Sequence, residues 1–236
     1  MKTKILLVFA LLLAGISCKK DTPASPYPKD GLISYFGFND TVLDKQNYAT
    51  IGTAKFSYVT GISGKAVHFN GVDEALEFIP TAPVVNTKIS LSFWYKTAEA
   101  GNTKYFISGN GFRFATALSS AAFVINAPNI DNAHSNANLP NQWTHVVGTY
   151  DGTSIQIYVN GVWIASTNNP GSISGFNSSM MLGVYQAIYW AGSIDELYIY
   201  NRALSQAEVT QLYNLNLGND RQSSSLLNNQ HLLKWR

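Results

Sequence analysis

Apolar and polar residues alternate with a period of two along most of the chain between residues 31 and 200. Runs rich in Val, Ile, Tyr, Phe and Trp are separated by Gly, Asn and Asp, which favour turns. Short strands that follow one another without intervening helices predict an all-β fold, a two-sheet antiparallel sandwich. The twelve predicted strands are 31–38, 65–69, 75–79, 89–96, 104–108, 112–117, 121–125, 144–150, 154–159, 162–167, 180–185 and 193–200.

Two turns fix how neighbouring strands pair. Asn160-Gly161 tolerates the positive φ angles of a tight hairpin turn, and apolar residues alternate on both sides of it. Asp151-Gly152 has the same composition one strand earlier. We therefore expect a three-stranded meander over residues 144–166.

One short helix is predicted after the last strand. Ser205 has the character of a helix N-cap, and Glu208 three residues later completes a capping box. This helix closes a single domain over residues 31–216. Residues 217–236 lack a clear pattern and are expected to form an irregular tail.

The N-terminus has the features of an export signal. Lys2 and Lys4 precede a short apolar run over 5–13, and small residues lead to Cys18. The segment LAGISC, which ends at Cys18, resembles a bacterial lipoprotein signal, and this resemblance implies cleavage after residue 17 and lipid acylation of Cys18. The alternative is ordinary cleavage beside an incidental cysteine. Residues 19–30 contain three prolines and predict an extended tether.

Composition bears on disulfide bonds, membrane attachment and nucleic-acid binding. Cys18 is the only cysteine, so no intramolecular disulfide staples the fold. The apolar run near the N-terminus is shorter than the roughly 20 residues that span a bilayer, so membrane attachment is expected through the lipid alone. Without Lys2 and Lys4, basic and acidic residues balance, whereas a nucleic-acid partner would favour a basic excess. Nucleic acid is therefore not expected as a ligand.

Four stretches carry a resemblance to a known family. They are GLISYFGFND near the start of the domain, GKAVHFNGVDEALEF, NQWTHVVGTYDGTSIQIYVNGVWIAS and the terminal GSIDELYIYNRALSQAEVTQLYN. In this order they resemble the laminin-G-like, concanavalin A-like jelly-roll modules of bacterial secreted proteins. The resemblance implies a jelly-roll sandwich, but fold alone does not determine function.

Candidate catalytic groups are sparse. Glycoside hydrolysis generally needs two facing carboxyl groups about 5 to 9 Å apart. In the densest acidic cluster, Asp73 and Glu77 share a strand face but lie roughly 13 Å apart, while Glu74 points the other way. The four histidines lack the local spacing of a metal pair. We therefore expect no enzyme.

A structural Ca²⁺ is a candidate cofactor. The loop FNDTVLDKQN offers Asn39, Asp40, Asp44 and Asn47, the oxygen ligands that calcium prefers. The family resemblance implies a calcium ligand at Asp195. If the first and last strands adjoin, Asp44 and Asp195 could share an ion. The alternative is that Asp195 and Glu196 orient loops by hydrogen bonds.

The best candidate for glycan binding is the segment GVYQAIYWAG. Tyr185, Tyr189 and Trp190 could stack on sugar rings while Gln186 reads hydroxyl groups. The long loop 126–142 adds six asparagines and His134. The alternative places Trp190 in the packing at the edge of the sandwich.

These observations predict a binding module exported to the bacterial outer membrane or cell surface. Its leading ligand is a glycan. A second hypothesis is a structural or adhesive lipoprotein whose partner is an envelope or extracellular protein. A third is a relative of glycoside hydrolases or polysaccharide lyases.

Overall fold

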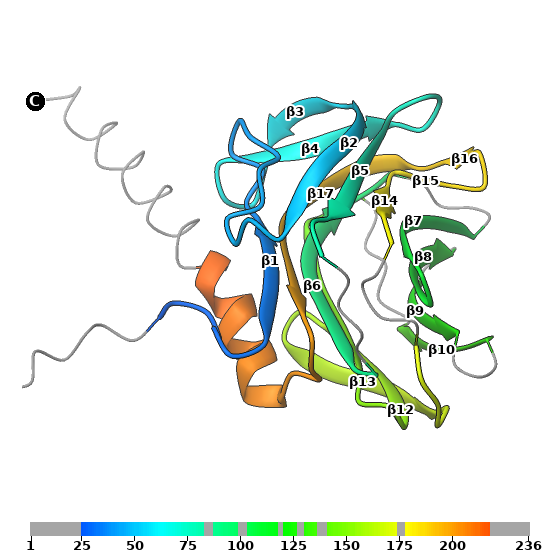
Figure 1. Cartoon of the computed structure of the whole chain (residues 1–236). Helices are drawn as coiled ribbons and strands as arrows, with labels where there is room; N and C mark the ends of the chain where they lie inside the picture. The colour runs from blue at the N-terminus through cyan, green and yellow to red at the C-terminus, as the bar shows by residue number, and fades with distance from the viewer. Residues whose placement is uncertain are drawn as a thin grey trace, which may run out of the picture.

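Two large antiparallel sheets lie face to face around one hydrophobic core (Figure 1). The computed structural model describes residues 25–82, 87–98, 103–117, 120–126, 130–135, 141–173 and 178–217. The signal sequence, Cys18 and all of the predicted tail except Leu217 lie outside these residues. Within them, the predicted two-sheet jelly-roll class is confirmed.

Sheet A has eight strands in the order β13-β12-β11-β6-β17-β4-β3, and β1 also pairs with β17. Its longest strand, β17, lies between β6 and β4, which are both far from it in the sequence. The strands are β1 (Leu32–Phe36), β3 (Ser57–Thr60), β4 (Lys65–Asn70), β6 (Ile89–Lys96), β11 (Thr144–Tyr150), β12 (Ser154–Val159), β13 (Val162–Asn168) and β17 (Ala191–Tyr200).

Sheet B has seven strands in the order β10-β9-β8-β7-β14-β5-β2. A separate two-stranded hairpin, β15–β16, precedes β17. The strands are β2 (Ala49–Lys55), β5 (Ala75–Pro80), β7 (Lys104–Gly109), β8 (Phe112–Ala117), β9 (Ser120–Asn126), β10 (Ile130–Ser135), β14 (Met180–Leu182), β15 (Val184–Tyr185) and β16 (Ile188–Tyr189).

The core forms because alternate residues of each strand point between the sheets. Stacked aromatic rings cross the interface: Phe36 of sheet A lies 3.9 Å from Phe78 of sheet B, measured between ring centroids. Phe93 meets Phe114 edge to face at 4.8 Å. Aromatic side chains therefore hold the two layers together without a disulfide.

The predicted meander is confirmed. β11, β12 and β13 pair consecutively, and Asn160 and Gly161 adopt φ angles of 49° and 80° in the turn between the last two. At the preceding turn, the carboxylate of Asp151 accepts hydrogen bonds from the backbone N–H groups of Thr153 and Ser154. The residues of these two turns therefore favour the observed pairing of β11 with β12 and of β12 with β13, as expected.

β17 changes partners along one of its edges. Residues Ala191–Ile194 pair with β4, and residues Leu197–Tyr200 pair with β1. Asp195 and Glu196 fill the gap between the two partners, where the register also shifts against β6. Glu196 has a φ of 51°, a left-handed conformation at the point where the strand bulges.

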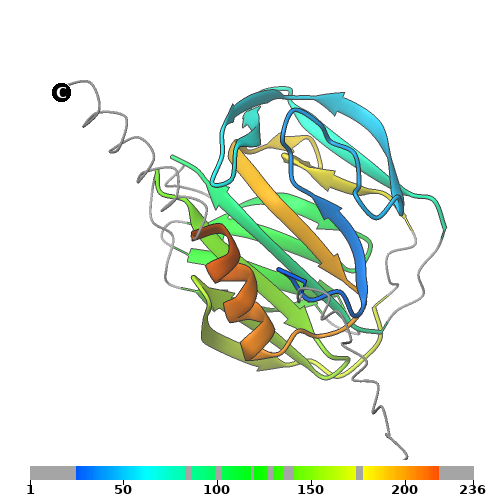
Figure 2. The ribbon, with the colours of Figure 1, turned by 90° about the vertical axis from the view of Figure 1, so that its left-hand side faces the viewer.

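The C-terminal helix, residues 206–217, packs on the outer face of sheet A, as Figure 2 shows. The predicted capping box is present. The backbone N–H of Ser205 donates to Glu208 at 2.8 Å, and the N–H of Glu208 donates to the Ser205 hydroxyl at 3.4 Å. No helix of the described residues is long and apolar enough to cross a membrane.

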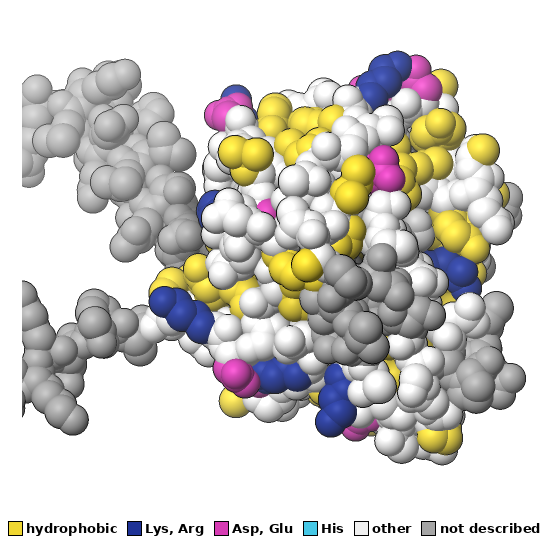
Figure 3. All heavy atoms as spheres, viewed as in Figure 1, with side chains coloured by type: hydrophobic (Ala, Val, Ile, Leu, Met, Phe, Trp, Pro, Cys, Tyr) yellow, Lys and Arg dark blue, Asp and Glu magenta, His cyan; other side chains and the backbone are white. Residues whose placement is uncertain are grey.

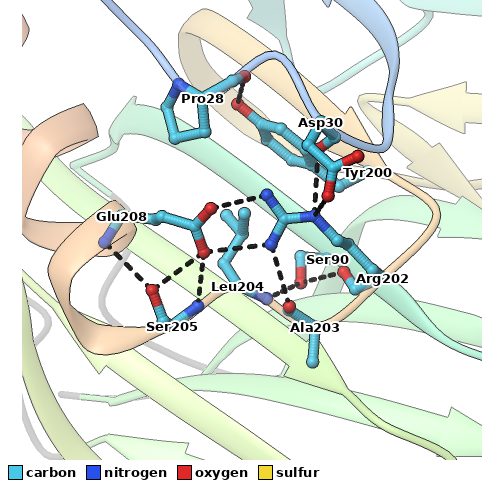
Figure 4. A network of polar contacts seen from close by, with 9 residues as sticks. All are labelled: Pro28, Asp30, Ser90, Tyr200, Arg202, Ala203, Leu204, Ser205 and Glu208. Carbon is cyan, nitrogen blue, oxygen red and sulfur yellow. Dashed lines mark hydrogen bonds and ion pairs between the residues drawn. The ribbon is translucent and has the colours of Figure 1, made fainter.

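Arg202 links three parts of the chain at the start of this helix (Figure 4). Its guanidinium donates to both carboxylate oxygens of Glu208 and, through Nε, to the backbone carbonyl of Asp30. The Tyr200 hydroxyl donates to the carbonyl of Pro28 at 3.1 Å. The end of the predicted tether is thus fastened to the sandwich.

Three features differ from the sequence-based expectations. β2, β3, β10 and β16 were not among the predicted strands, and β10 occupies the middle of the segment 126–142 that was expected to be a loop. The ring of Tyr27, in the predicted tether, packs 5.5 Å from the rings of Tyr35 and Tyr198. Part of the tether is therefore packed against the domain.

Candidate functional site

An open pocket of about 420 Å³ lies on the outer face of sheet A, where β17 begins. We call it the strand-end pocket. Its floor is a row of three residues, because Ser193 of β17 pairs with His68 of β4 on one side and with Lys96 of β6 on the other. His68 Nδ1 lies 3.0 Å from Ser193 Oγ. The row faces outward because its sequence neighbours, such as Ile194, belong to the core.

The walls of the strand-end pocket come from segments on either side of this row. Trp143 and Asn141, just before β11, line the side next to β6. Val59 and Thr60 of β3 line the opposite side, next to β4. The Trp143 side chain is half-buried. The pocket thus combines an aromatic face with hydroxyl, amide, imidazole and ammonium groups.

Trp190 does not serve as a surface platform, contrary to the expectation from sequence. Its side chain is 0% exposed and stacks on Phe106 at 4.8 Å between ring centroids. It supports the strand-end pocket from within, because a Cβ added to Gly192, which lines the pocket, would lie 2.3 Å from the Trp190 ring. The alternative was packing at the edge of the sandwich, and the structure places Trp190 in the core itself.

The other three predicted ligand-binding residues lie on the β15–β16 hairpin. Gln186 is exposed at its turn, and Tyr185 and Tyr189 are half-buried. The Tyr185 hydroxyl accepts a hydrogen bond from Arg113 of β8 at 2.9 Å, and the Tyr185 ring meets Tyr105 of β7 edge to face. These residues do not line the strand-end pocket. They form a separate polar-aromatic surface next to sheet B.

Asp44 organises the loop after β1. One carboxylate oxygen accepts from the backbone N–H groups of Tyr35 and Gln46, each at 2.9 Å. The other accepts from the N–H groups of Tyr48 and Ala49 and from the Ser34 hydroxyl. The five donors around the Asp44 carboxylate hold the loop in place, which is the alternative to binding a cation.

Asp195 is held in the same way. One carboxylate oxygen accepts from the N–H groups of Ile62 and Ser63, at 2.9 and 3.1 Å. Burial, together with the neighbouring charge of Glu196, raises the pKa of Asp195 to about 8. Glu196 accepts hydrogen bonds from the hydroxyl groups of Tyr35 and Tyr198, beside a smaller cavity of about 140 Å³.

Calcium stays a prediction from sequence. Asp44 and Asp195 bond to different segments of the chain. Within the described ranges, no three His, Cys, Asp or Glu side chains gather closely enough to hold a metal ion.

Several other titratable groups have structural partners. In the acidic cluster, Asp73 pairs with Lys55 and Asn70, and Glu77 accepts from the N–H of Thr53. His145 is buried beneath the helix, where its Nε2 lies 2.9 Å from the Ser92 hydroxyl. Burial lowers its pKa to about 3, so it stays neutral at physiological pH.

Sequence reasoning missed the residues of the strand-end pocket. No binding role was assigned to Trp143, and the histidines, His68 among them, were considered only as possible metal ligands. The one available signal was the position of Trp143 just outside the alternating run 144–150, next to polar residues. The sequence does not reveal that His68, Lys96 and Ser193 share a row, because this depends on the strand order.

The stacked sheets define a jelly-roll sandwich, and comparison with known proteins identifies the family. The model of the Laminin_G_3 family, described as the concanavalin A-like lectin/glucanases superfamily, matches residues 70–210, more than half of the chain. The chain belongs to this superfamily. No curated protein sequence matches it.

Solved structures resemble the chain over most of its length. The receptor binding domain of botulinum neurotoxin D aligns with a TM-score of 0.67 at 13% identity, over 78% of this chain and 52% of that one. The chain therefore spans about half the length of the neurotoxin binding domains. Domain 4 of AbnA, a GH43 extracellular arabinanase from Geobacillus stearothermophilus in complex with arabinotriose, aligns with a TM-score of 0.63 at 25% identity, over 77% of this chain and 98% of that domain.

Proposed function

We propose that the chain is a carbohydrate-binding module and that the strand-end pocket holds the sugar. The observation that carries this proposal is the position of the Trp143 indole beside the polar row His68–Ser193–Lys96 in one open pocket. An aromatic face packs against the C–H surface of a sugar ring, while polar groups at its edge bond to the hydroxyl groups.

The size of the pocket suits this role. Its volume of about 420 Å³ falls within the range of roughly 300–1,000 Å³ that is usual for small-molecule sites. The floor consists of paired strands with hydrogen bonds on both sides of β17. A rigid floor positions the polar groups before a ligand arrives, which lowers the entropic cost of binding.

The comparisons support a sugar as the ligand class. The arabinanase domain is matched over nearly its whole length and was solved in complex with arabinotriose. The chain also belongs to a superfamily described as lectins and glucanases.

Two observations favour binding over catalysis. No Asp or Glu is among the described residues that line the strand-end pocket. The acidic cluster Asp73, Glu74 and Glu77 is engaged in hydrogen bonds with Asn70, Lys55 and Thr53. A pair of facing carboxyl groups free to act on a glycosidic bond is what a hydrolase would need.

We also propose that the chain is exported and held at a bacterial surface by lipid on Cys18. The fold would then present the pocket away from the membrane. β17 begins at the pocket and ends at Tyr200, beside residues 28–31 of the N-terminal segment. Ten residues of extended strand, about 30 Å, separate the two.

A binding experiment with paired tryptophan variants tests the glycan proposal. The purified chain is screened on a glycan array, and hits are measured again by calorimetry with Trp143→Ala and Trp163→Ala. Trp163, on β13, is 49% exposed and lies outside the pocket, so it is the matched control. We expect Trp143→Ala to weaken binding at least tenfold and Trp163→Ala to leave it unchanged. Equal effects of the two variants, or no glycan bound at all, would contradict the proposal.

A protein partner is the second candidate, because β13 is an edge strand of sheet A and its first residues are exposed, although Thr167 near its end contacts β10. Three consecutive apolar side chains of this strand are exposed: Val162 (61%), Trp163 (49%) and Ile164 (38%). Edge strands with free backbone groups readily pair with another chain. In that case Trp163→Ala, and not Trp143→Ala, would abolish binding to the partner.

A further inference from the structure

Two side chains that line the strand-end pocket, Lys96 and Trp143, can only donate hydrogen bonds, and this bears on the ligand. Lys96 offers three N–H donors and Trp143 one, and neither side chain can accept. Sugar hydroxyl groups both donate and accept, whereas carboxylate and sulfate groups only accept. A pocket of this composition therefore complements a sugar that carries an anionic substituent.

Lys96 is a cation without a counter-ion. Its side chain is half-buried on the pocket floor, and within the described part of the chain no hydrogen bond or ion pair reaches its ammonium group. Three other basic residues have acidic partners: Lys55 pairs with Asp73, Lys65 with Asp40 and Arg202 with Glu208. On the face shown in Figure 3, several Lys or Arg side chains likewise lie beside Asp or Glu. Partial burial of an unpaired charge is unfavourable, and an anionic ligand would remove that cost.

The surroundings do not offset the charge of Lys96. The carboxyl group closest to the row along β17 is Asp195, two residues after Ser193. Its carboxylate oxygens are already engaged, because they accept hydrogen bonds from three backbone N–H groups, those of Ile62, Ser63 and Glu196. His68, at the other end of the row, can add a donor but no negative charge.

The geometry of the row determines where the anion would lie. Lys96 and His68 flank Ser193 on the two adjacent strands. With a strand spacing of about 4.8 Å, their Cα atoms are roughly 10 Å apart, so one sugar ring fits between them above Ser193. Trp143, on the Lys96 side, would cover one face of that ring.

We propose that the strand-end pocket selects acidic glycans and that Lys96 binds their carboxylate or sulfate group. The inference rests on the proposed function, because it specifies the sugar class for the same pocket. Uronic acids and sulfated sugars share the required chemistry, an anionic group on a pyranose ring.

The test compares acidic glycans with neutral versions of the same polymers. The purified chain is titrated with polygalacturonate, alginate and a sulfated galactan, and with their fully methyl-esterified or desulfated forms. Neutral arabinan and galactan oligosaccharides complete the panel. We expect an acidic polymer to bind at least tenfold more tightly than its neutral form, with an affinity that falls as salt rises. Comparing the carboxylated polymers with the sulfated galactan then shows which of the two anionic groups the pocket binds.

Variants at Lys96 complete the test. Lys96→Met keeps the aliphatic stem and removes the charge, and we expect it to weaken acidic-glycan binding about tenfold, the equivalent of about 1.4 kcal/mol. Lys96→Arg keeps the charge and should retain most of the affinity. Lys88→Met, outside the pocket, is the control for net charge.

The outcomes separate the two proposals. If neutral forms bind as well as acidic ones, or if Lys96→Met binds normally, the inference about acidic glycans fails while the pocket remains a glycan site. If no polymer of either kind binds, the proposed function itself fails.

Discussion

Replacing Glu208 with Gln tests how the C-terminal helix is attached to the sandwich. The carboxylate accepts from both terminal nitrogens of Arg202 and from the N–H and hydroxyl of Ser205 (Figure 4). Gln keeps the size of the side chain and removes its charge. The variant therefore loses the charge-assisted bonds without leaving a cavity.

The magnitude follows from the pKa of Glu208. Hydrogen bonding from Arg202 lowers this pKa from 4.5 to about 2. By linkage, a shift of this size corresponds to an upper limit of about 3 kcal/mol of stability at neutral pH. The Arg202 and Glu208 side chains are 24% and 26% exposed, and solvent screening reduces the expected value to about 1–2 kcal/mol.

The sign of the pH dependence gives a second measurement. Because the pKa is lowered in the folded state, the stabilisation is complete above pH 4.5 and is lost as the pH falls towards 2. Urea unfolding at pH 7 should therefore show the variant about 0.5–1 M lower in midpoint than wild type, for an m-value of about 2 kcal/mol/M. At pH 2 the two midpoints should nearly coincide.

Asp30→Asn is the matched control. Asp30 contacts the same guanidinium at 3.1 Å, but its side chain is 90% exposed, so we expect a change below about 0.5 kcal/mol. Equal stability of Glu208→Gln and wild type at pH 7 would refute the reasoning. So would a difference that persists at pH 2.

Three further predictions concern other parts of the chain. Trp190→Ala should lower the free energy of unfolding by about 3–5 kcal/mol, because it empties a core site, and an unchanged urea midpoint would contradict this. The free energy of unfolding should fall as the pH rises from about 4 to about 8, because folded Asp195 holds a proton that the unfolded chain releases. Thermal unfolding at pH 5 and pH 8 measures this, and a higher midpoint at pH 8 would contradict it. Cys18→Ala should abolish incorporation of radiolabelled palmitate in a bacterial host, and continued labelling would remove the lipid-anchor proposal.

The sequence predicted the strands of the sandwich interior better than its edges. β2 and β10 form the two edges of sheet B, and β3 is an edge of sheet A; none of the three was predicted. An edge strand is covered on fewer sides, so it needs fewer apolar residues and often carries polar ones. β10, with the sequence IDNAHS, illustrates this, since its composition is typical of a loop.

The candidate site was less predictable for two physical reasons. Aromatic residues serve equally in cores and in binding surfaces, and only the packing of Trp190 on Phe106 distinguishes these roles. The strand-end pocket, moreover, is assembled from residues spread between Val59 and Ser193. Strand order brings them together, and periodicity reports which face a residue occupies but not which strand lies beside it.

The course of β17 has a mechanical consequence. A ligand pulled away from a chain anchored at its N-terminus would transmit force along this strand, from Ser193 to the contacts of Tyr200 and Arg202 with residues 28–31. The hydrogen bonds to β1, β4 and β6 run across that direction, so they would be loaded in shear and share the load instead of opening one at a time. A pull on the ligand would therefore be resisted by many hydrogen bonds of sheet A at once.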